Sequence, residues 1–82
     1  MKDQIIVYGA EWCGFCHQEM RYLDDLKVKY KYIDVDKVEG AADESIKKSE
    51  QRGIPVTDIG GDIIIGFDRP KIDASLKAHA LV

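Results

Sequence analysis

Residues 5–17 read IIVYGAEWCGFCH, and this stretch decides how the chain folds. It opens with residues 5–8 (IIVY), a short run of β-branched and aromatic residues that is typical of a strand buried on both faces. Cys13 and Cys16 follow, and beyond them apolar residues recur every three or four positions, which is the period of an amphipathic helix. We therefore predict a strand that passes into a helix at the cysteine pair.

A second strand and a second helix are expected next along the chain. Residues 30–35 are rich in Tyr, Ile and Val, which favours a strand. After an acidic connection, a helix is predicted from about residue 41 to residue 52, with Ala42 and Ile46 on its inner face. Gly53 is placed to end this helix.

The last third of the sequence predicts a hairpin and a final helix. The apolar segments 56–59 and 63–67 are joined through residues 60–62 (GGD), whose glycines tolerate the positive φ of a tight turn, so the segments should pair antiparallel. Asp68 is a good N-cap for the helix that follows. The apolar stripe of that helix consists of Ile72, Leu76 and Ala80.

These elements give the order β-α-β-α-β-β-α over residues 1–82, which we interpret as a single α/β domain. A chain of 82 residues is long enough for one compact domain and too short for two. The β-α-β half implies a right-handed crossover, with helices covering the sheet. We expect a four-stranded mixed sheet between helix layers.

The composition of the chain argues against several classes of function. Lys and Arg number 12 against 15 Asp and Glu, a net charge of −3, which argues against a nucleic-acid partner. No apolar stretch approaches the roughly 20 residues that span a membrane, and the N-terminus lacks the apolar core of a secretory signal. We therefore expect a cytoplasmic protein, a monomer, with no membrane partner. In that reducing compartment a close cysteine pair is catalytic or metal-binding more often than structural.

The position of the cysteine pair favours thiol chemistry. Cys13 is placed where unpaired N–H groups and the positive end of the helix dipole favour a thiolate, the attacking species in disulfide exchange. Cys16, three residues on, lies beside it on the same helix face. We predict that Cys13 is the nucleophile and that Cys16 resolves the mixed disulfide.

The cysteine pair also allows three other interpretations. Residues 13–17 also spell the c-type haem attachment motif, but that motif belongs to exported, mostly helical cytochromes. A zinc site would need four ligands, and only the two cysteines, His17 and the distant His79 are present, so no metal site is expected. Two buried cysteines without chemistry are the third possibility, although Trp12 makes a poor core setting.

Several motifs together resemble those of the thioredoxin superfamily, and most of all its small glutaredoxin-like proteins. They are the Cys-x-x-Cys helix start, residues 53–56 (GIPV), the Gly-Gly hairpin at 60–61 and residues 66–68 (GFD). Residues 10–14 (AEWCG) are similar to thioredoxin. The run 66–70 is similar to redoxins that serve ribonucleotide reductase. The resemblance covers nearly the whole chain and implies a thioredoxin-like fold.

The resemblance also implies a substrate site around the cysteines. Pro55 would be the family's cis-proline opposite the active site. The backbone of Ile54 would then pair with a bound peptide or with glutathione. Trp12 and Phe15 would flank the sulfur atoms as an apolar platform for substrate.

Glutathione recognition is implied at a second group of residues. Phe67 and Asp68 match the position where the family holds the γ-glutamyl end of glutathione. The glutaredoxin lysine three residues before the first cysteine is Ala10 here, which weakens the expected glutathione site. Arg52 is the candidate to supply one positive charge to a carboxylate.

A further difference concerns proton transfer. Thioredoxins place a buried aspartate six residues before the first cysteine, and this chain has Val7 there. We therefore expect no internal proton acceptor for Cys16, and proton traffic through solvent or His17.

These observations predict a thiol-disulfide oxidoreductase acting in electron transport and cell redox homeostasis. Its substrates would be protein disulfides or mixed disulfides with glutathione. It would hold no cofactor tightly and would take electrons from glutathione or a thioredoxin-type flavoprotein reductase. Two alternatives stay open: a glutathione-dependent iron-sulfur cluster carrier of the glutaredoxin type, and a non-catalytic binding module with this fold.

Overall fold

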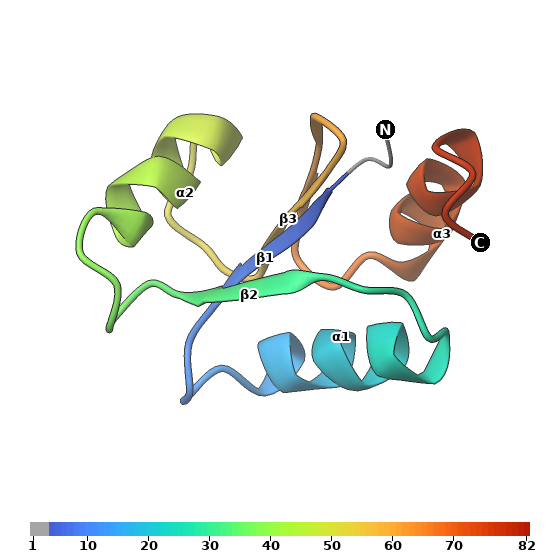
Figure 1. Ribbon diagram of the computed structural model, residues 1–82. Coiled ribbons are helices and arrows are strands. Elements are labelled where there is room, and N and C mark those ends of the chain that lie inside the picture. Colours follow the sequence, from blue (N-terminus) through green and yellow to red (C-terminus); the bar gives the residue numbers. More distant parts are fainter. Residues whose placement is uncertain (1–3) are drawn as a thin grey trace.

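A computed structural model describes residues 4–82 and contains four strands and three helices (Figure 1). They are β1 (Ile5–Gly9), α1 (Gly14–Asp25), β2 (Lys31–Asp34), α2 (Ala41–Ser49), β3 (Val56–Ile59), β4 (Asp62–Ile65) and α3 (Arg69–Ala78). The predicted order β-α-β-α-β-β-α is confirmed. No helix in the described range has the length and apolar character to span a bilayer.

The strands form one mixed sheet in the order β2-β1-β3-β4. β1 runs parallel to β2, with Val7 opposite Tyr32. On its other side β1 is antiparallel to β3, where Val7 lies opposite Thr57, and β3 and β4 form the predicted antiparallel hairpin. Gly60 and Gly61 make its turn with φ of 56° and 102°, a backbone conformation that favours glycine.

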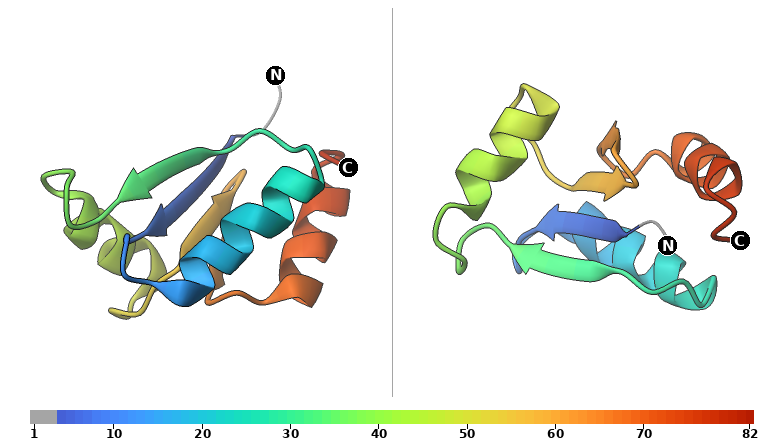
Figure 2. Two further views of the ribbon diagram at one scale, coloured as in Figure 1. Left: turned by 90° about the horizontal axis from the view of Figure 1, so that it is seen from below. Right: turned by 45° about the horizontal axis from the view of Figure 1, so that its top comes forward.

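Helices cover both faces of this sheet, as predicted. α1 and α3 lie side by side on one face and α2 covers the other (Figure 2). The main core fills the space between the sheet and the α1/α3 pair, and its fully buried members come from all three. They are Ile5, Val7, Leu23, Ile59, Ile64, Ile72 and Leu76. Of the stripe predicted for the last helix, only Ala80 lies outside this core, because α3 ends at Ala78.

The inner face of α2 differs from the prediction. Its buried residues are Ala41, Ser45 and Ser49, whereas Ala42 is exposed and Ile46 is half-buried. These three small residues stand at i, i+4 and i+8 and therefore share one face of the helix. The Ser49 hydroxyl is satisfied because it donates to the Ser45 carbonyl at 2.7 Å.

α2 also ends three residues before the predicted boundary. Glu50 follows it with φ 58°, and the side chain of Gln51 then bonds to both backbone groups of Gly53, at 2.6 and 2.9 Å. This local network, which the glycine signal could not reveal, shapes the loop that leads to Ile54 and Pro55. At the other end of the hairpin, β4 stops before Gly66, which has φ 77°, so Phe67 lies outside the strand predicted for 63–67.

Candidate active site

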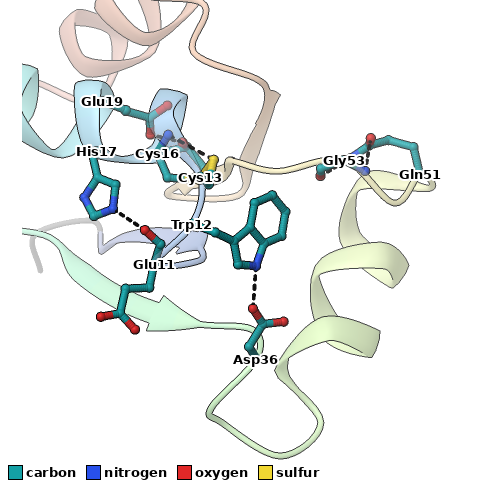
Figure 3. The surroundings of a disulfide bond; sticks show 10 residues. Glu11, Trp12, Cys13, Cys16, His17, Glu19, Asp36, Gln51 and Gly53 are labelled. Carbon is teal, nitrogen blue, oxygen red and sulfur yellow. Dashed lines mark hydrogen bonds between the residues drawn. A yellow bond between two sulfur atoms is a disulfide. The ribbon is translucent and has the colours of Figure 1, made fainter.

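The two cysteines form a disulfide at the start of α1, with Cα atoms 5.2 Å apart (Figure 3). Cys13 is the N-cap of the helix, and the backbone N–H of Cys16 donates to its Sγ at 3.1 Å. The unpaired N–H groups and the dipole of a helix N-terminus favour negative charge at this position. Once the disulfide is opened, the same contacts stabilise a thiolate on Cys13.

The two sulfur-bearing residues differ in access. Cys13 is 6% exposed, whereas Cys16 is fully buried. Cys16 is packed so closely that a Cβ added at Gly9 would lie 3.0 Å from its Sγ. Gly9 is therefore part of the site, although the sequence analysis did not identify it as a site residue. A thiol or disulfide that approaches from solvent meets Cys13 first.

An apolar cluster surrounds the pair. Cys13 and Cys16 pack with the fully buried Ala10, and the half-buried Ile54 lies against this cluster. The Ile54–Pro55 peptide bond is cis, as the resemblance implies, and Pro55 is buried. The loop before β3 therefore lies next to the cysteines, although 38 positions separate Cys16 from Ile54 in the sequence.

Trp12 and Phe15 are exposed, at 72% and 65%, one on each side of Cys13 in the sequence. The indole N–H of Trp12 donates to Asp36 Oδ2 at 2.7 Å, which fixes the ring beside the disulfide (Figure 3). No sequence pattern pointed to Asp36. Two large apolar side chains left in solvent beside a reactive pair form a surface suited to contact another molecule.

Charged groups border this surface. Glu11 forms an ion pair with Lys37 at 3.0 Å, with both side chains well exposed. Arg52 is exposed in the loop between α2 and Ile54. The charge of Glu11 is thus balanced locally by Lys37.

Phe67 and Asp68 both have structural contacts. The Phe67 ring packs against Tyr22 of α1, with centroids 5.9 Å apart, at the edge of the main core. Asp68 is the predicted N-cap of α3 and accepts from the N–H of Lys71 at 3.3 Å. The segment nevertheless runs beside the site, because the Gly66 N–H donates to the Pro55 carbonyl at 2.8 Å.

The structure adds a buried carboxyl that the expectation about proton transfer did not consider. His17 is exposed, and its Nε2–H donates to the Glu11 carbonyl at 2.7 Å, away from the sulfur atoms (Figure 3). Glu19, by contrast, is fully buried in the surroundings of the disulfide. Its Oε2 accepts from the Thr57 hydroxyl, and its Oε1 has no hydrogen-bond partner within residues 4–82. Burial raises the pKa of Glu19 to about 7, against the lowering effect of the Thr57 hydrogen bond.

Sequence reasoning missed Glu19, since a glutamate on a charged amphipathic helix is ordinarily assigned to the solvent face. The available signal was its spacing, three residues after Cys16 and therefore on the same helix face. In the described part of the chain, no three His, Cys, Asp or Glu side chains gather as a metal site would require.

Comparisons with known proteins agree with this geometry. The family model described as glutaredoxin matches residues 5–64. A glutaredoxin-like 8.6 kDa protein encoded in the rubredoxin operon of Clostridium pasteurianum is 30% identical over 73 residues, which cover 89% of this chain and 97% of that protein.

Solved structures show the same fold. The glutaredoxin of Methanosarcina mazei Go1 superposes with a TM-score of 0.79 at 32% identity, covering 89% of this chain and 77% of that one. Buckwheat glutaredoxin, in complex with glutathione, has a TM-score of 0.78 at 22% identity, covering 98% and 82%. The thioredoxin-like fold is thereby confirmed. Because the family model matches most of the sequence and includes the cysteine pair, the chain belongs to the glutaredoxin family.

Proposed function

We propose that the protein is a dithiol oxidoreductase that reduces protein disulfides, or mixed disulfides with glutathione, through Cys13 and Cys16. The observation that carries this proposal is the asymmetry of the pair at the start of α1. Cys13 is the more accessible sulfur and accepts a backbone N–H, whereas Cys16 is fully buried beside it. Membership of the glutaredoxin family supports a thiol-disulfide role.

The reaction follows from these positions. The Cys13 thiolate attacks one sulfur of the substrate disulfide, forms a mixed disulfide and releases the other sulfur as a thiol after protonation. Cys16 then attacks Cys13 Sγ, which closes the intramolecular disulfide and releases the second substrate thiol. Two electrons pass from the protein dithiol to the substrate. The 5.2 Å between the two Cα atoms lies within the range that a disulfide needs.

The exposed aromatic side chains would supply the substrate contact. Trp12 and Phe15 are exposed on either side of Cys13 in the sequence, and Trp12 is held in place by its hydrogen bond to Asp36. Ile54 lies against the cysteine cluster but precedes the β3 ladder, which begins at Val56. Its backbone is therefore available to pair with an extended segment of a bound protein.

We propose that a flavoprotein reductase regenerates the dithiol faster than glutathione does. Ala10, at the position of the glutaredoxin lysine, is fully buried and offers no charge to a glutathione carboxylate. Lys37 is engaged by Glu11, and Arg52, exposed in the loop that leads to Ile54, is the candidate cation for a glutathione carboxylate. Glutathione remains the competing donor, as it is bound in the buckwheat structure.

Cysteine variants test the roles in the reaction. Cys13→Ser should abolish disulfide reduction, whereas Cys16→Ser should accumulate a mixed disulfide with substrate, because only the resolving step is lost. Mass spectrometry of the reaction products distinguishes the two outcomes. If iodoacetamide at mildly acidic pH labels Cys16 before Cys13 in the reduced protein, the assignment of the nucleophile is wrong.

The electron donor is tested by coupled NADPH oxidation. The oxidised protein is paired separately with glutathione plus its reductase and with a thioredoxin-type reductase, using one protein disulfide as the final acceptor. Faster turnover with the second system supports the proposed donor. Faster turnover with glutathione assigns the protein to glutathione-dependent reduction. A brown protein dimer that fails with both donors would instead favour the iron-sulfur carrier.

A further inference from the structure

The contacts of the buried Glu19 side chain do not explain why a carboxyl is present at this position. Its side chain is fully buried between α1 and the sheet, and one of its two oxygens, Oε1, has no protein partner in the described chain. A buried polar atom without a partner costs free energy, and glutamine or leucine would avoid the cost of a charge at this position. An unpaired buried carboxyl beside a reactive group is a common arrangement where proton transfer occurs.

The position of Glu19 on α1 associates its carboxyl with the Cys16 sulfur. Glu19 follows Cys16 by three residues on α1, so the two side chains leave the same face of the helix. Figure 3 shows the carboxyl directed toward the cysteine pair. From the other side, the Thr57 hydroxyl of β3 donates to Oε2, which holds the carboxyl between the sheet and the first turns of the helix.

Cys16 needs such a partner because it is fully buried. Only the thiolate attacks a disulfide, so the proton of the Cys16 thiol must leave before the mixed disulfide can be resolved. His17 does not serve this purpose, since it is exposed and its Nε2–H is bonded to the Glu11 carbonyl.

Building on the proposed disulfide reduction, we propose that the Glu19 carboxylate accepts the proton of the Cys16 thiol in the resolving step. The resulting Cys16 thiolate attacks Cys13 Sγ, the bond from Cys13 to the substrate sulfur breaks, and the substrate leaves as a thiolate that takes a proton from water. When a reductant thiolate later attacks Cys13, Cys16 leaves as a thiolate and Glu19 returns a proton to it. Over the two half-reactions Glu19 therefore takes up one proton and gives one back, and it ends the cycle as the carboxylate with which it began.

The surroundings of Glu19 suit a proton that moves in both directions. Burial raises its pKa to about 7, so both protonation states are populated near neutral pH. No cation among residues 4–82 forms an ion pair with the carboxyl. Besides the two cysteines, the titratable neighbour is Tyr30, whose pKa is raised to about 12 by burial and by Asp24, so it stays neutral from pH 5 to 9.

Within residues 4–82, burial and the Thr57 hydrogen bond are the causes that shift the pKa of Glu19, and no further charged group contributes. The strand that faces the carboxyl brings the neutral hydroxyl of Thr57. The pH dependence of the resolving step should therefore follow Glu19.

The test separates the two chemical steps in one stopped-flow trace. The reduced protein is mixed with excess dithiobis(nitrobenzoate), and the coloured thiol is followed as it is released. The first phase reports attack by Cys13 and depends on reagent concentration. The second reports resolution by Cys16 and does not. In the wild type, the rate of the second phase should rise up to about pH 7 and then level off.

Glu19→Gln keeps the size of the side chain and an acceptor for Thr57 but cannot take up a proton. Its second phase should be about 100-fold slower at pH 7 and should keep rising through pH 9, with an unchanged first phase. Asp58→Asn, an acid-to-amide change on the opposite face of the sheet, is the matched control and should keep the wild-type profile of the second phase. A second phase in Glu19→Gln within threefold of the wild type, with the same levelling, would overturn the proposal.

A second variant covers the case in which Glu19→Gln fails to fold. Thr57→Val removes the hydrogen bond that lowers the pKa of Glu19, so the levelling of the second phase should move to higher pH. If Glu19 has a purely structural role, the pH at which the rate of the second phase levels off should not change in Thr57→Val. An unchanged levelling pH would therefore refute the proposal. If the wild type shows no first phase at all, the proposed disulfide chemistry fails instead, which keeps the two failures distinct.

Discussion

Replacing Glu19 by glutamine should make the stability of the protein less sensitive to pH. The carboxyl is fully buried, and burial raises its pKa from 4.5 to about 7. Between these values the folded state binds more protons than the unfolded state, so the stabilising contribution is complete below pH 4.5 and is lost as the pH rises through about 7. The glutamine variant carries no charge and lacks this loss.

The size of the effect follows from the two pKa values. A difference of one in pKa corresponds to about 1.4 kcal/mol between the two protonation states. For values of 4.5 and about 7, the wild type should lose between about 2 and 3 kcal/mol of unfolding free energy from pH 5 to pH 8 because of Glu19. For a small domain this is a large fraction of the total stability.

Urea unfolding of the oxidised wild type and the oxidised Glu19→Gln variant at pH 5 and pH 8 measures this difference. The closed disulfide removes thiol titration, and every other ionisable group is the same in the two proteins, so its contribution cancels in the comparison. At pH 5 the variant should be no more stable than the wild type. Its amide NH₂ takes the place of Oε1, which has no hydrogen-bond partner within residues 4–82, so the amide donors would be buried without partners. The stability of the variant relative to the wild type should then rise by about 2 to 3 kcal/mol at pH 8. A relative stability that changes by less than about 0.5 kcal/mol would refute a raised pKa at Glu19.

Three other substitutions test contacts around the site. Gly9→Ala should lower stability by about 1 to 3 kcal/mol in urea unfolding, because its Cβ would lie 3.0 Å from the Sγ of Cys16; an unchanged midpoint would show that the helix start can shift freely. Asp58→Asn should lower the unfolding free energy by about 1 to 2 kcal/mol in the same assay, because the half-buried ammonium of Lys48, 2.7 Å from the wild-type carboxylate, loses its counterion. Adding salt to the wild type should not cause a loss of this size. Trp12→Ala should raise the KM for a protein disulfide substrate while changing stability by less than about 0.5 kcal/mol, and a large stability loss with an unchanged KM would assign this exposed ring to the fold instead.

Local sequence patterns were enough to predict the order of the elements and the place of the cysteines. Both follow from local rules: the period of apolar residues distinguishes helix from strand, and the hairpin requires Gly60 and Gly61 at its turn. The N-cap at Asp68 is equally local, since it depends on one side chain and the next turn of backbone. Cys13 at a helix start was predictable for the same reason.

Details that depend on two distant segments were decided only by the tertiary structure. The inner face of α2 consists of Ala41, Ser45 and Ser49, which the helical period alone did not distinguish from Ala42 and Ile46. The position of Trp12 depends on Asp36, 24 residues away. None of these contacts leaves a periodic signal in the sequence.

Glu19 shows this division most clearly. Local rules assign a glutamate in a charged helix to solvent, and its spacing from Cys16 indicates only a shared helix face. Glu19 is buried because β3 places Thr57 against that helix face and the surrounding residues exclude water from the carboxyl. A pKa depends on the surroundings of the charge in three dimensions, so packing determined the pKa of Glu19. The pair Cys13 and Cys16, by contrast, could be recognised from the sequence alone.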